Sequence, residues 1–374
     1  MKRILQVVSC LESGGTETFI INNYKNINRQ ELQFDFLVFV EGEHPYFDEI
    51  KSMGGRIFFC GTPLMSNINK FIERTSNIIK QNGPYAAVHS HVNIANSWVM
   101  LAAKRAGIPI RISHSHATTG MKYGGIKYVY RKFQLGILKK NATHFFACSK
   151  EAGEYLYGKT FFSKFGRVVR NGISVDKFIN ADRNETDSLR KQFNCQNQDM
   201  VVGNVTRFDS NKNQLFIIEI FKEILKYRPC AVLVLGGVDG GQLDAIVHKV
   251  KEFKIDKNVR FIGRRNDIPH CLKLIDVYLF PSLHEGLGIA LLEAQASGCE
   301  CVASTGVSKE ADMGIGNITF ISLEETPQYW AKKIVEIYDN REIPSAGKIK
   351  KCFATKGYLI EDTARKLVEV YESN

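Results

Sequence analysis

Short runs of β-branched and aromatic residues alternate with helix-like segments along the whole of this 374-residue chain, and that alternation is what most restricts its fold. Strands separated by helices form parallel sheets with helices packed on both faces. Two successive sets of strands indicate two such domains. The expected strands are residues 4–9, 36–39, 56–59, 87–90, 110–113, 144–147 and 167–169 in the first set, and 201–205, 231–235, 259–262, 277–280 and 301–303 in the second.

The composition, 44% hydrophobic and 24% charged, is that of a globular protein. No apolar run reaches the roughly 18 residues that a membrane-spanning helix needs. The opening residues, MKRILQVVSC, contain too short an apolar run for a signal peptide, so we expect them to form the first buried strand. Nine cysteines without a repeated spacing indicate reduced thiols in the cytoplasm rather than a disulfide framework.

The positive charge is confined to the first half of the chain. Residues 1–170 contain 23 Lys or Arg against 11 Asp or Glu, whereas the remainder contains 27 against 28. Between Glu73 and Glu151 there are twelve basic residues and no acidic one. Such asymmetry indicates an anionic partner: a phosphorylated substrate, a membrane surface or a nucleic acid. No motif of a nucleic-acid reader accompanies the charge, so we expect no nucleic acid.

Two loops that follow expected strands have residues suited to phosphate. The first strand runs into SCLESGGTE, where Gly14 and Gly15 let the backbone approach a phosphate closely. The strand at 201–205 is followed by Arg207 and Lys212, two cations that could clamp a diphosphate. A plain tight turn and a solvated surface remain the alternatives for these two loops. No D-x-D sequence occurs, so a two-carboxylate magnesium clamp is not expected.

Four histidines lie at the ends of two expected strands: His89, His91, His114 and His116. Two H-x-H pairs on adjacent strands could bind zinc, but no carboxylate or cysteine accompanies them. A histidine at the carboxyl end of a strand is better placed to contact a ligand, because open α/β sheets bind ligands at that edge. We therefore expect no metal and favour an active-site histidine.

The stretch HEGLGIALLEAQASGCEC places Glu285 and Glu293 eight positions apart. Gly286 and Gly288 make one continuous helix unlikely there. The pattern instead predicts Glu285 on a loop at the mouth of a helix and Glu293 about two turns inside it. A strand, a glycine-rich loop and a helix in succession form the geometry that binds anions at a helix N-terminus.

Aromatic and basic residues interleave in MKYGGIKYVYRKFQLGILKK. Ile126, Tyr130, Phe133 and Ile137 recur at helical spacing, which is compatible with an amphipathic helix on an anionic membrane surface. An ordinary packed helix with a solvated basic face is the equal alternative. The basic residues expected to meet a membrane or an acceptor are Lys122, Lys127, Arg131 and Lys132.

Taken in order along nearly the whole chain, several motifs resemble those of the retaining family-four glycosyltransferases, close to the bacterial capsule and exopolysaccharide branch. These are SGGTE, ACSKEAGEYLYG with VVRNGISVDKF, the R-x₄-K of Arg207 and Lys212, VRFIGRRNDIP, and the E-x₇-E block DVYLFPSLHEGLGIALLEAQASGCECVAS. The E-x₇-E block is the most specific. Leu287 departs from the pattern, since many relatives have an aromatic residue there.

The resemblance implies a GT-B fold, in which two Rossmann-like domains face each other across a cleft. It implies an acceptor-binding domain over residues 1–175, a nucleotide-sugar-binding domain over 176–355, and a C-terminal helix over 356–374 that returns to the first domain. It further implies that a hexose or N-acetylhexosamine passes from a nucleotide sugar to a growing, lipid-linked surface polysaccharide with retention at the anomeric carbon.

The resemblance also implies roles for single residues. Glu285 and His116 would lie beside the donor sugar, and Glu293 would accept hydrogen bonds from the ribose. Arg207 and Lys212 would neutralise the departing diphosphate in place of a metal. The remaining donor-site residues would be Gly14, Gly15, Gly286, Leu287 and Gly288.

UDP is the expected nucleotide, with GDP left open, and no further cofactor is expected. The expected location is the cytoplasm, and peripheral attachment to the inner face of the plasma membrane follows if the acceptor is lipid-linked. Two alternatives remain: a non-hydrolysing sugar-nucleotide epimerase, which would act without an acceptor, and a non-catalytic protein that binds an anionic ligand.

Overall fold

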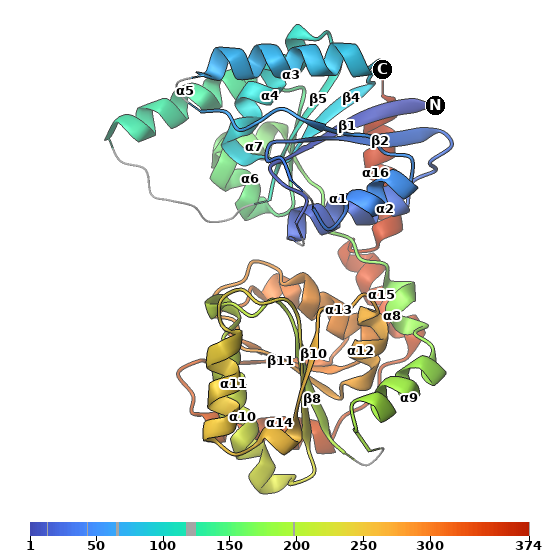
Figure 1. Cartoon of the computed structure of the whole chain (residues 1–374), viewed down its shortest axis with the longest axis vertical. Coiled ribbons are helices and arrows are strands. Elements are labelled where there is room, and N and C mark those ends of the chain that lie inside the picture. The colour runs from blue at the N-terminus through green and yellow to red at the C-terminus, as the bar shows by residue number, and fades with distance from the viewer. Residues whose placement is uncertain (13, 43, 65–66, 117–124, 197–198, 374) are drawn as a thin grey trace. The chain divides into compact units, whose positions relative to one another are not determined.

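The computed structural model describes residues 1–12, 14–42, 44–64, 67–116, 125–196 and 199–373. The chain divides into two compact units: unit 1 is Met1–Gly172 with Gly357–Asn374, and unit 2 is Ile173–Lys356. Each unit contains one parallel sheet covered by helices (Figure 1). The expected α/β architecture with two Rossmann-like domains is therefore confirmed.

Unit 1 has a seven-stranded sheet in the order β3-β2-β1-β4-β5-β6-β7. Its strands are β1 (Lys2–Val8), β2 (Leu32–Val38), β3 (Ile57–Phe59), β4 (Ala87–Ser90), β5 (Ile110–Ser115), β6 (His144–Ala147) and β7 (Gly166–Val168). Its helices are α1 (Gly15–Lys25), α2 (Phe47–Ser52), α3 (Ile68–Asn82), η2 (Asn93–Ala95), α4 (Asn96–Arg105), α5 (Gly125–Asn141), α6 (Lys150–Tyr157), α7 (Lys159–Phe165) and α16 (Ile360–Glu372).

Unit 2 has a six-stranded sheet in the order β10-β9-β8-β11-β12-β13. Its strands are β8 (Val201–Val205), β9 (Val232–Gly236), β10 (Val259–Gly263), β11 (Val277–Phe280), β12 (Glu300–Ser304) and β13 (Ile318–Ile321). Its helices are α8 (Val175–Ile179), α9 (Arg183–Gln192), η3 (Ser210–Lys212), α10 (Gln214–Tyr227), α11 (Leu243–Glu252), η4 (Asp256–Asn258), α12 (Ile268–Leu274), α13 (Ile289–Ser297), η5 (Lys309–Ala311), α14 (Pro327–Asp339) and α15 (Ala346–Lys356).

Alternating side chains of the strands build a core on each face of the unit 1 sheet. Leu5 and Val7 of β1 pack with residues of α3, α4 and α6, whereas Ile4 and Val8 pack with residues of α1 and α16. The C-terminal helix thus supplies part of the unit 1 core. Burial on both faces is why these strands read as almost continuous apolar runs in the sequence.

The structure contains elements that the sequence analysis does not predict. Strand β13 was not expected, because ITFI is only four residues long and follows a glycine-rich stretch. The polar segment that follows Asn171 forms the two helices α8 and α9. Asp182 caps α9 by accepting a hydrogen bond from the Asn184 backbone N–H, a local signal that favours helix over loop.

Both sheets reverse their strand order at one point. In unit 1 the reversal lies between β1 and β4, and in unit 2 it lies between β8 and β11. The loops that leave the carboxyl ends of such a pair run to opposite faces of the sheet, so a crevice opens between them. Open α/β sheets bind their ligands at such switch points, so each unit has one candidate position for a ligand.

Candidate functional site

In unit 2 the loops that follow β8 and β11 meet at the switch point and bring two predicted residues together. The ammonium of Lys212 forms an ion pair with Oε1 of Glu285. Nδ2 of Asn211 donates to the same oxygen at 3.2 Å and to the His284 carbonyl at 2.9 Å. Only 19% and 18% of the Lys212 and Glu285 side chains are exposed, so a cation and a carboxylate share one sheltered position.

Arg207 lies in the same loop but is differently placed. Its Nε donates to the Asp209 carboxylate at 3.0 Å, and 62% of the side chain is exposed. Asp209 also accepts from the backbone N–H groups of Asn211 and Lys212. The loop therefore holds Lys212 in place through an Asp cap and leaves the Arg207 guanidinium largely in solvent.

The glycine-rich loop that carries Glu285 is fixed by its backbone. The N–H of Glu285 donates to the Gly306 carbonyl at 3.1 Å, and its own carbonyl accepts from the Ser308 N–H at 3.0 Å. Gly288 has φ +68°, and a Cβ at that position would lie 2.8 Å from the Phe280 ring. Gly286 and Leu287 lie between these two fixed points. A glycine is thus required at position 288 by both conformation and space.

Glu293 is the fifth residue of α13, one turn inside the helix rather than the two turns expected from the sequence. The helix begins only at Ile289, because the left-handed conformation of Gly288 ends the loop there. Within the described ranges, no hydrogen bond or ion pair reaches the Glu293 carboxyl. Burial raises the pKa of this carboxyl to about 7. It is an acceptor group without a partner near the loop that holds Glu285.

In unit 1 the Gly14-Gly15 loop leads from β1 into α1, as its sequence predicts. A carboxylate lies against it, because a Cβ on Gly14 would lie 2.4 Å from Oε2 of Glu17. Glu17 is 8% exposed, and burial, with Glu12 nearby, raises its pKa. Glu17 was missed in the sequence because a glutamate in the first turn of a helix is usual.

The four histidines gather at the carboxyl ends of β4 and β5, next to the Phe19 ring. The ring nitrogens lie 3.1 Å apart between His89 and His114 and 2.9 Å apart between His91 and His116. Along each strand the ring centroids lie 4.2 Å apart; His114 and His116 are stacked, whereas His89 and His91 are tilted by 34°. Burial lowers the pKa of all four imidazoles, that of His116 to about 3, so the rings are neutral.

His89, His91 and His114 each have a ring nitrogen within 4.8 Å of those of the others, a spacing that deserves comparison with a metal site. However, these nitrogens already hydrogen-bond to one another or to Tyr371 and Gln6. The cluster is a hydrogen-bonded network.

A hollow of about 400 Å³ lies at the unit 1 switch point. Its polar lining comes from Ser9, Thr16, Glu17, Thr62, His91 and Asn93. Asn93 has φ +51°, and its buried Oδ1 has no hydrogen-bond partner among the described residues. A strained asparagine with an unused acceptor, beside a carboxyl and three hydroxyls, suits a ligand rich in hydroxyl groups. No local pattern in the sequence predicts a role for Asn93.

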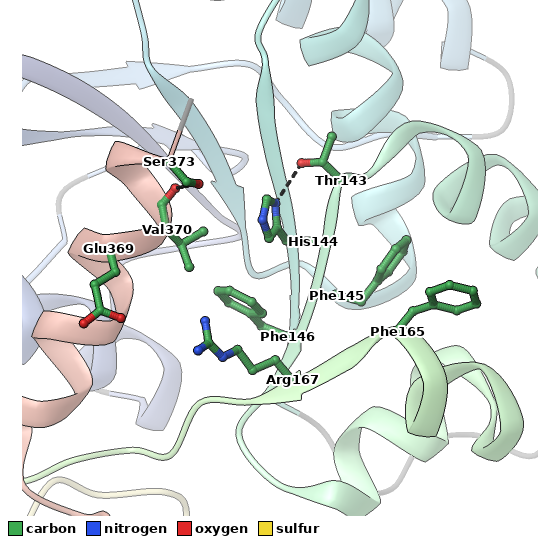
Figure 2. Close-up of a pocket in the computed structure, with 9 residues that line it drawn as sticks. All are labelled: Thr143, His144, Phe145, Phe146, Phe165, Arg167, Glu369, Val370 and Ser373. Carbon is green, nitrogen blue, oxygen red and sulfur yellow. Dashed lines mark hydrogen bonds between the residues drawn. The ribbon is translucent and has the colours of Figure 1, made fainter.

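A second hollow, of about 430 Å³, lies beside β6, the edge strand β7 and α16 (Figure 2). Its lining includes Phe145, Phe146 and Phe165, and His144 there bonds to the Thr143 hydroxyl at 3.0 Å. Burial, and then the charge of Arg167, lower the pKa of His144. Because His144 begins β6, this hollow reaches the amino end of that strand, and we do not include it in the candidate site.

The predicted basic segment forms α5, and Lys122 lies outside the described residues. Arg131 stacks on the Tyr155 ring at 4.9 Å, and Lys132 lies 4.7 Å from the Tyr128 ring centroid, while Lys127 is exposed. The expected apolar face is only partly correct, because Tyr130 and Ile137 pack against the core. Among the side chains described in this helix, the exposed apolar ones are Tyr128, Val129 and Phe133, of which only Phe133 belongs to the expected face; the Ile126 side chain lies outside the description. Nowhere in the described residues is a helix both long and apolar enough to cross a bilayer.

Comparison with known proteins supplies the family. Residues 185–351 match the model of glycosyl transferases group 1, and residues 13–177 match that of Glycosyltransferase Family 4. The EpsF protein of Bacillus subtilis (strain 168), whose name assigns it to the glycosyltransferases, is 32% identical over 378 residues, which covers 99% of this chain and 96% of EpsF.

Two further proteins are similar at lower identity. The Escherichia coli UDP-Gal:α-D-GlcNAc-diphosphoundecaprenol α-1,3-galactosyltransferase is 29% identical over 301 residues, 76% of each chain. The crystal structure of Anabaena HepE in complex with UDP shares the fold, with a TM-score of 0.78 at 17% identity over the whole of both chains. From these matches and the two Rossmann-like units, the chain belongs to the family-four glycosyltransferases of the GT-B fold class.

Proposed function

We propose that this glycosyltransferase moves a hexose or N-acetylhexosamine from a UDP-sugar to a growing, lipid-linked surface polysaccharide, with retention and without a metal. The contact of Lys212 with Glu285 at the unit 2 switch point, on the loop that leads into the helix of the unpartnered Glu293, is the observation that carries the proposal. The donor and acceptor named for the Escherichia coli relative, and the UDP bound by Anabaena HepE, support the choice of substrates. Family membership favours a transferase over the epimerase and binding-protein alternatives.

In unit 2 the ionised Glu293 accepts two ribose hydroxyls, and Lys212 and Arg207 balance the diphosphate charge as the glycosidic bond breaks. Both cations are engaged with carboxylates in this structure. The diphosphate therefore shares Lys212 with Glu285 rather than meeting a free ammonium. Because Glu285 is already paired with a cation, we assign it electrostatic stabilisation of the sugar and assign bond formation to same-face attack by the acceptor.

In unit 1 the proposed roles follow from the switch point between β1 and β4. Gly15 presents its backbone amide to phosphate beside Gly14, whose own N–H donates to the Glu12 carbonyl at 2.9 Å, and the neutral His116 bonds to a sugar hydroxyl. The 400 Å³ hollow takes the terminal sugar of the acceptor, with Asn93 Oδ1 and the Glu17 carboxyl as hydrogen-bond acceptors. The exposed Tyr128, Val129 and Phe133 of α5, with Lys127 and Lys132, bring the enzyme to the lipid that carries that acceptor.

Nucleotide binding is tested by thermal denaturation with UDP, GDP or ADP. A nucleotide at 100 times its dissociation constant adds about 2.7 kcal/mol, which shifts the midpoint by several degrees. We expect a shift with UDP and its loss in Glu293→Ala. Glu300→Ala is the matched control. Glu300 is also a partly buried glutamate of unit 2, but it lies at the amino end of β12, away from the carboxyl ends of the strands where the candidate site lies. No shift with any nucleotide, or one retained in Glu293→Ala, would contradict the donor site.

The affinity for UDP-glucose should depend on pH through Glu293. Below its pKa of about 7 the carboxyl is protonated and accepts hydroxyl donors poorly, so binding weakens as the pH falls. Between about pH 8 and pH 6 the dissociation constant should rise up to about tenfold, since one pKa unit is worth about 1.4 kcal/mol. Calorimetry is suitable, because the diester phosphates of UDP-glucose do not titrate in this range. Glu293→Gln should bind weakly at every pH; an unchanged pH dependence in that variant would assign the titration to another group.

The reaction is tested by transfer from UDP-glucose or UDP-galactose to N-acetylglucosamine diphosphoundecaprenol. Transfer should persist in EDTA, and NMR of the product should show the α configuration of the donor. A β product would exclude retention, and loss in EDTA would exclude metal independence.

In the same assay Asn93→Gly should raise the KM for the acceptor about tenfold with little change in the KM for the donor, since one buried hydrogen bond is worth roughly 1–1.5 kcal/mol. Glycine keeps the positive φ of that position. Asn194→Gly is the control, because Asn194 has the same φ of 51° in unit 2. Equal effects of the two substitutions would mean that Asn93 serves the backbone only.

Membrane attachment is tested by flotation with vesicles. Basic residues near anionic lipid contribute about 1 kcal/mol each, so Lys127→Ala with Lys132→Ala should weaken binding to vesicles rich in phosphatidylglycerol about thirtyfold. The exposed pair Lys257→Ala with Lys351→Ala, in unit 2, is the control. Binding that is weak and ignores the anionic lipid content would remove α5 as the membrane contact.

A further inference from the structure

A continuous chain of hydrogen bonds lies beneath the unit 1 switch point and reaches as far as the last helix. The Tyr371 hydroxyl of α16 lies 2.7 Å from Nδ1 of His89 and accepts from Nε2 of Gln6 at 3.2 Å. Oε1 of Gln6, on β1, lies 3.0 Å from Nε2 of His91. Tyr371, Gln6 and His89 are each at most 1% exposed, so water does not reach the middle of this chain.

The hydrogen-bond chain ends in a pair of histidines on each side. His89 continues through its Nε2 to Nδ1 of His114, and His91 continues through its Nδ1 to Nε2 of His116. Both terminal nitrogens, His114 Nε2 and His116 Nδ1, are buried and without a partner among the described residues. His116 is the member of the chain whose side chain is partly exposed at the carboxyl edge of the sheet.

One amide sets the direction of every proton in this chain. Gln6 has a donor at one end and an acceptor at the other, and each neutral imidazole has one of each. With Nε2 of Gln6 donating to Tyr371, the Tyr371 hydroxyl must donate to His89, and His91 must donate to Gln6. All four histidines then carry their proton on Nε2. The reverse amide orientation would place all four protons on Nδ1.

We propose that Gln6 and Tyr371 are positioning residues for His116: their hydrogen bonds hold its proton on Nε2, toward His91, and leave Nδ1 as a hydrogen-bond acceptor at the edge of the site. The Nε2–H tautomer is also the one that a free histidine favours. An acceptor nitrogen suits a sugar hydroxyl that must donate, and this last step rests on the proposed function. The C-terminal helix thereby acts on the site through a bond and not only through packing.

The proton positions are measured directly by long-range ¹H–¹⁵N correlation on the full chain with ¹⁵N-labelled histidine, since pyrrole-like and pyridine-like ring nitrogens have well-separated shifts. Single His→Gln substitutions assign the signals. In the wild type we expect the Nε2–H pattern for His89, His91, His114 and His116. In Tyr371→Phe the Gln6 amide loses its hydroxyl partner, and we expect His116 to become a mixture of both tautomers.

Tyr24→Phe is the matched control. Like Tyr371, Tyr24 is buried and contacts the Phe34 ring, Tyr24 by stacking and Tyr371 edge-on. Its hydroxyl bonds to Gln33, which is not part of the hydrogen-bond network of the histidines. Tyr24→Phe should leave the four signals unchanged. Gln6→Met, which breaks the chain at a different bond, serves as the second variant and should also give a mixture at His116.

An Nδ1–H signal for His116 in the wild type would overturn the proposal, and so would an unchanged Nε2–H signal in both Tyr371→Phe and Gln6→Met. If Tyr371→Phe does not fold, the spectra of the wild type and of Gln6→Met test the proposal. Transfer from UDP-glucose by His116→Ala separates the two levels of the argument. Full activity of that variant would contradict the proposed role of His116 and leave the tautomer assignment standing.

Discussion

The reversal of strand order within each parallel sheet is the constraint on which the rest of the structure depends. Neighbouring strands β8 and β11 send their loops to opposite faces, so the side chains at their carboxyl ends meet without a helix between them. Lys212 and Glu285 lie 73 residues apart in the chain and form an ion pair for this reason. In unit 1 the same reversal brings the Gly14-Gly15 loop, Asn93 and the histidines to one edge.

How much of this follows from sequence depends on the range of the interaction. Strands could be predicted because burial on both faces leaves apolar runs, and Gly288 because its loop demands a positive φ. The helix start at Ile289 was misplaced by about one turn, since neither glycine by itself marks the end of the loop. Gln6 and Tyr371 are 365 residues apart in the sequence, and no local pattern in either segment predicts their contact. Nothing in the residues around Asn93 signals its unused acceptor either.

Charge at the two switch points is handled in different ways. In unit 2 each cation of the clamp has its own carboxylate, Asp209 for Arg207 and Glu285 for Lys212. Both cations are thus already paired, so any anion that binds them must compete with these carboxylates. In the described part of unit 1 no carboxylate pairs with the four clustered histidines, and burial keeps them neutral.

Because the four imidazoles are neutral, ion pairs do not orient them, and hydrogen bonds between the rings do so instead. A charged histidine would need acceptors on both nitrogens, whereas His91 already accepts at one nitrogen when His116 donates to it. Protonation of any ring would break a bond inside the cluster, in addition to the cost of burying charge. The network and the lowered pKa values therefore support each other. Since Tyr371 completes the network, α16 is linked to the histidines of the first sheet through the Tyr371 hydroxyl and not only through the packing of its ring.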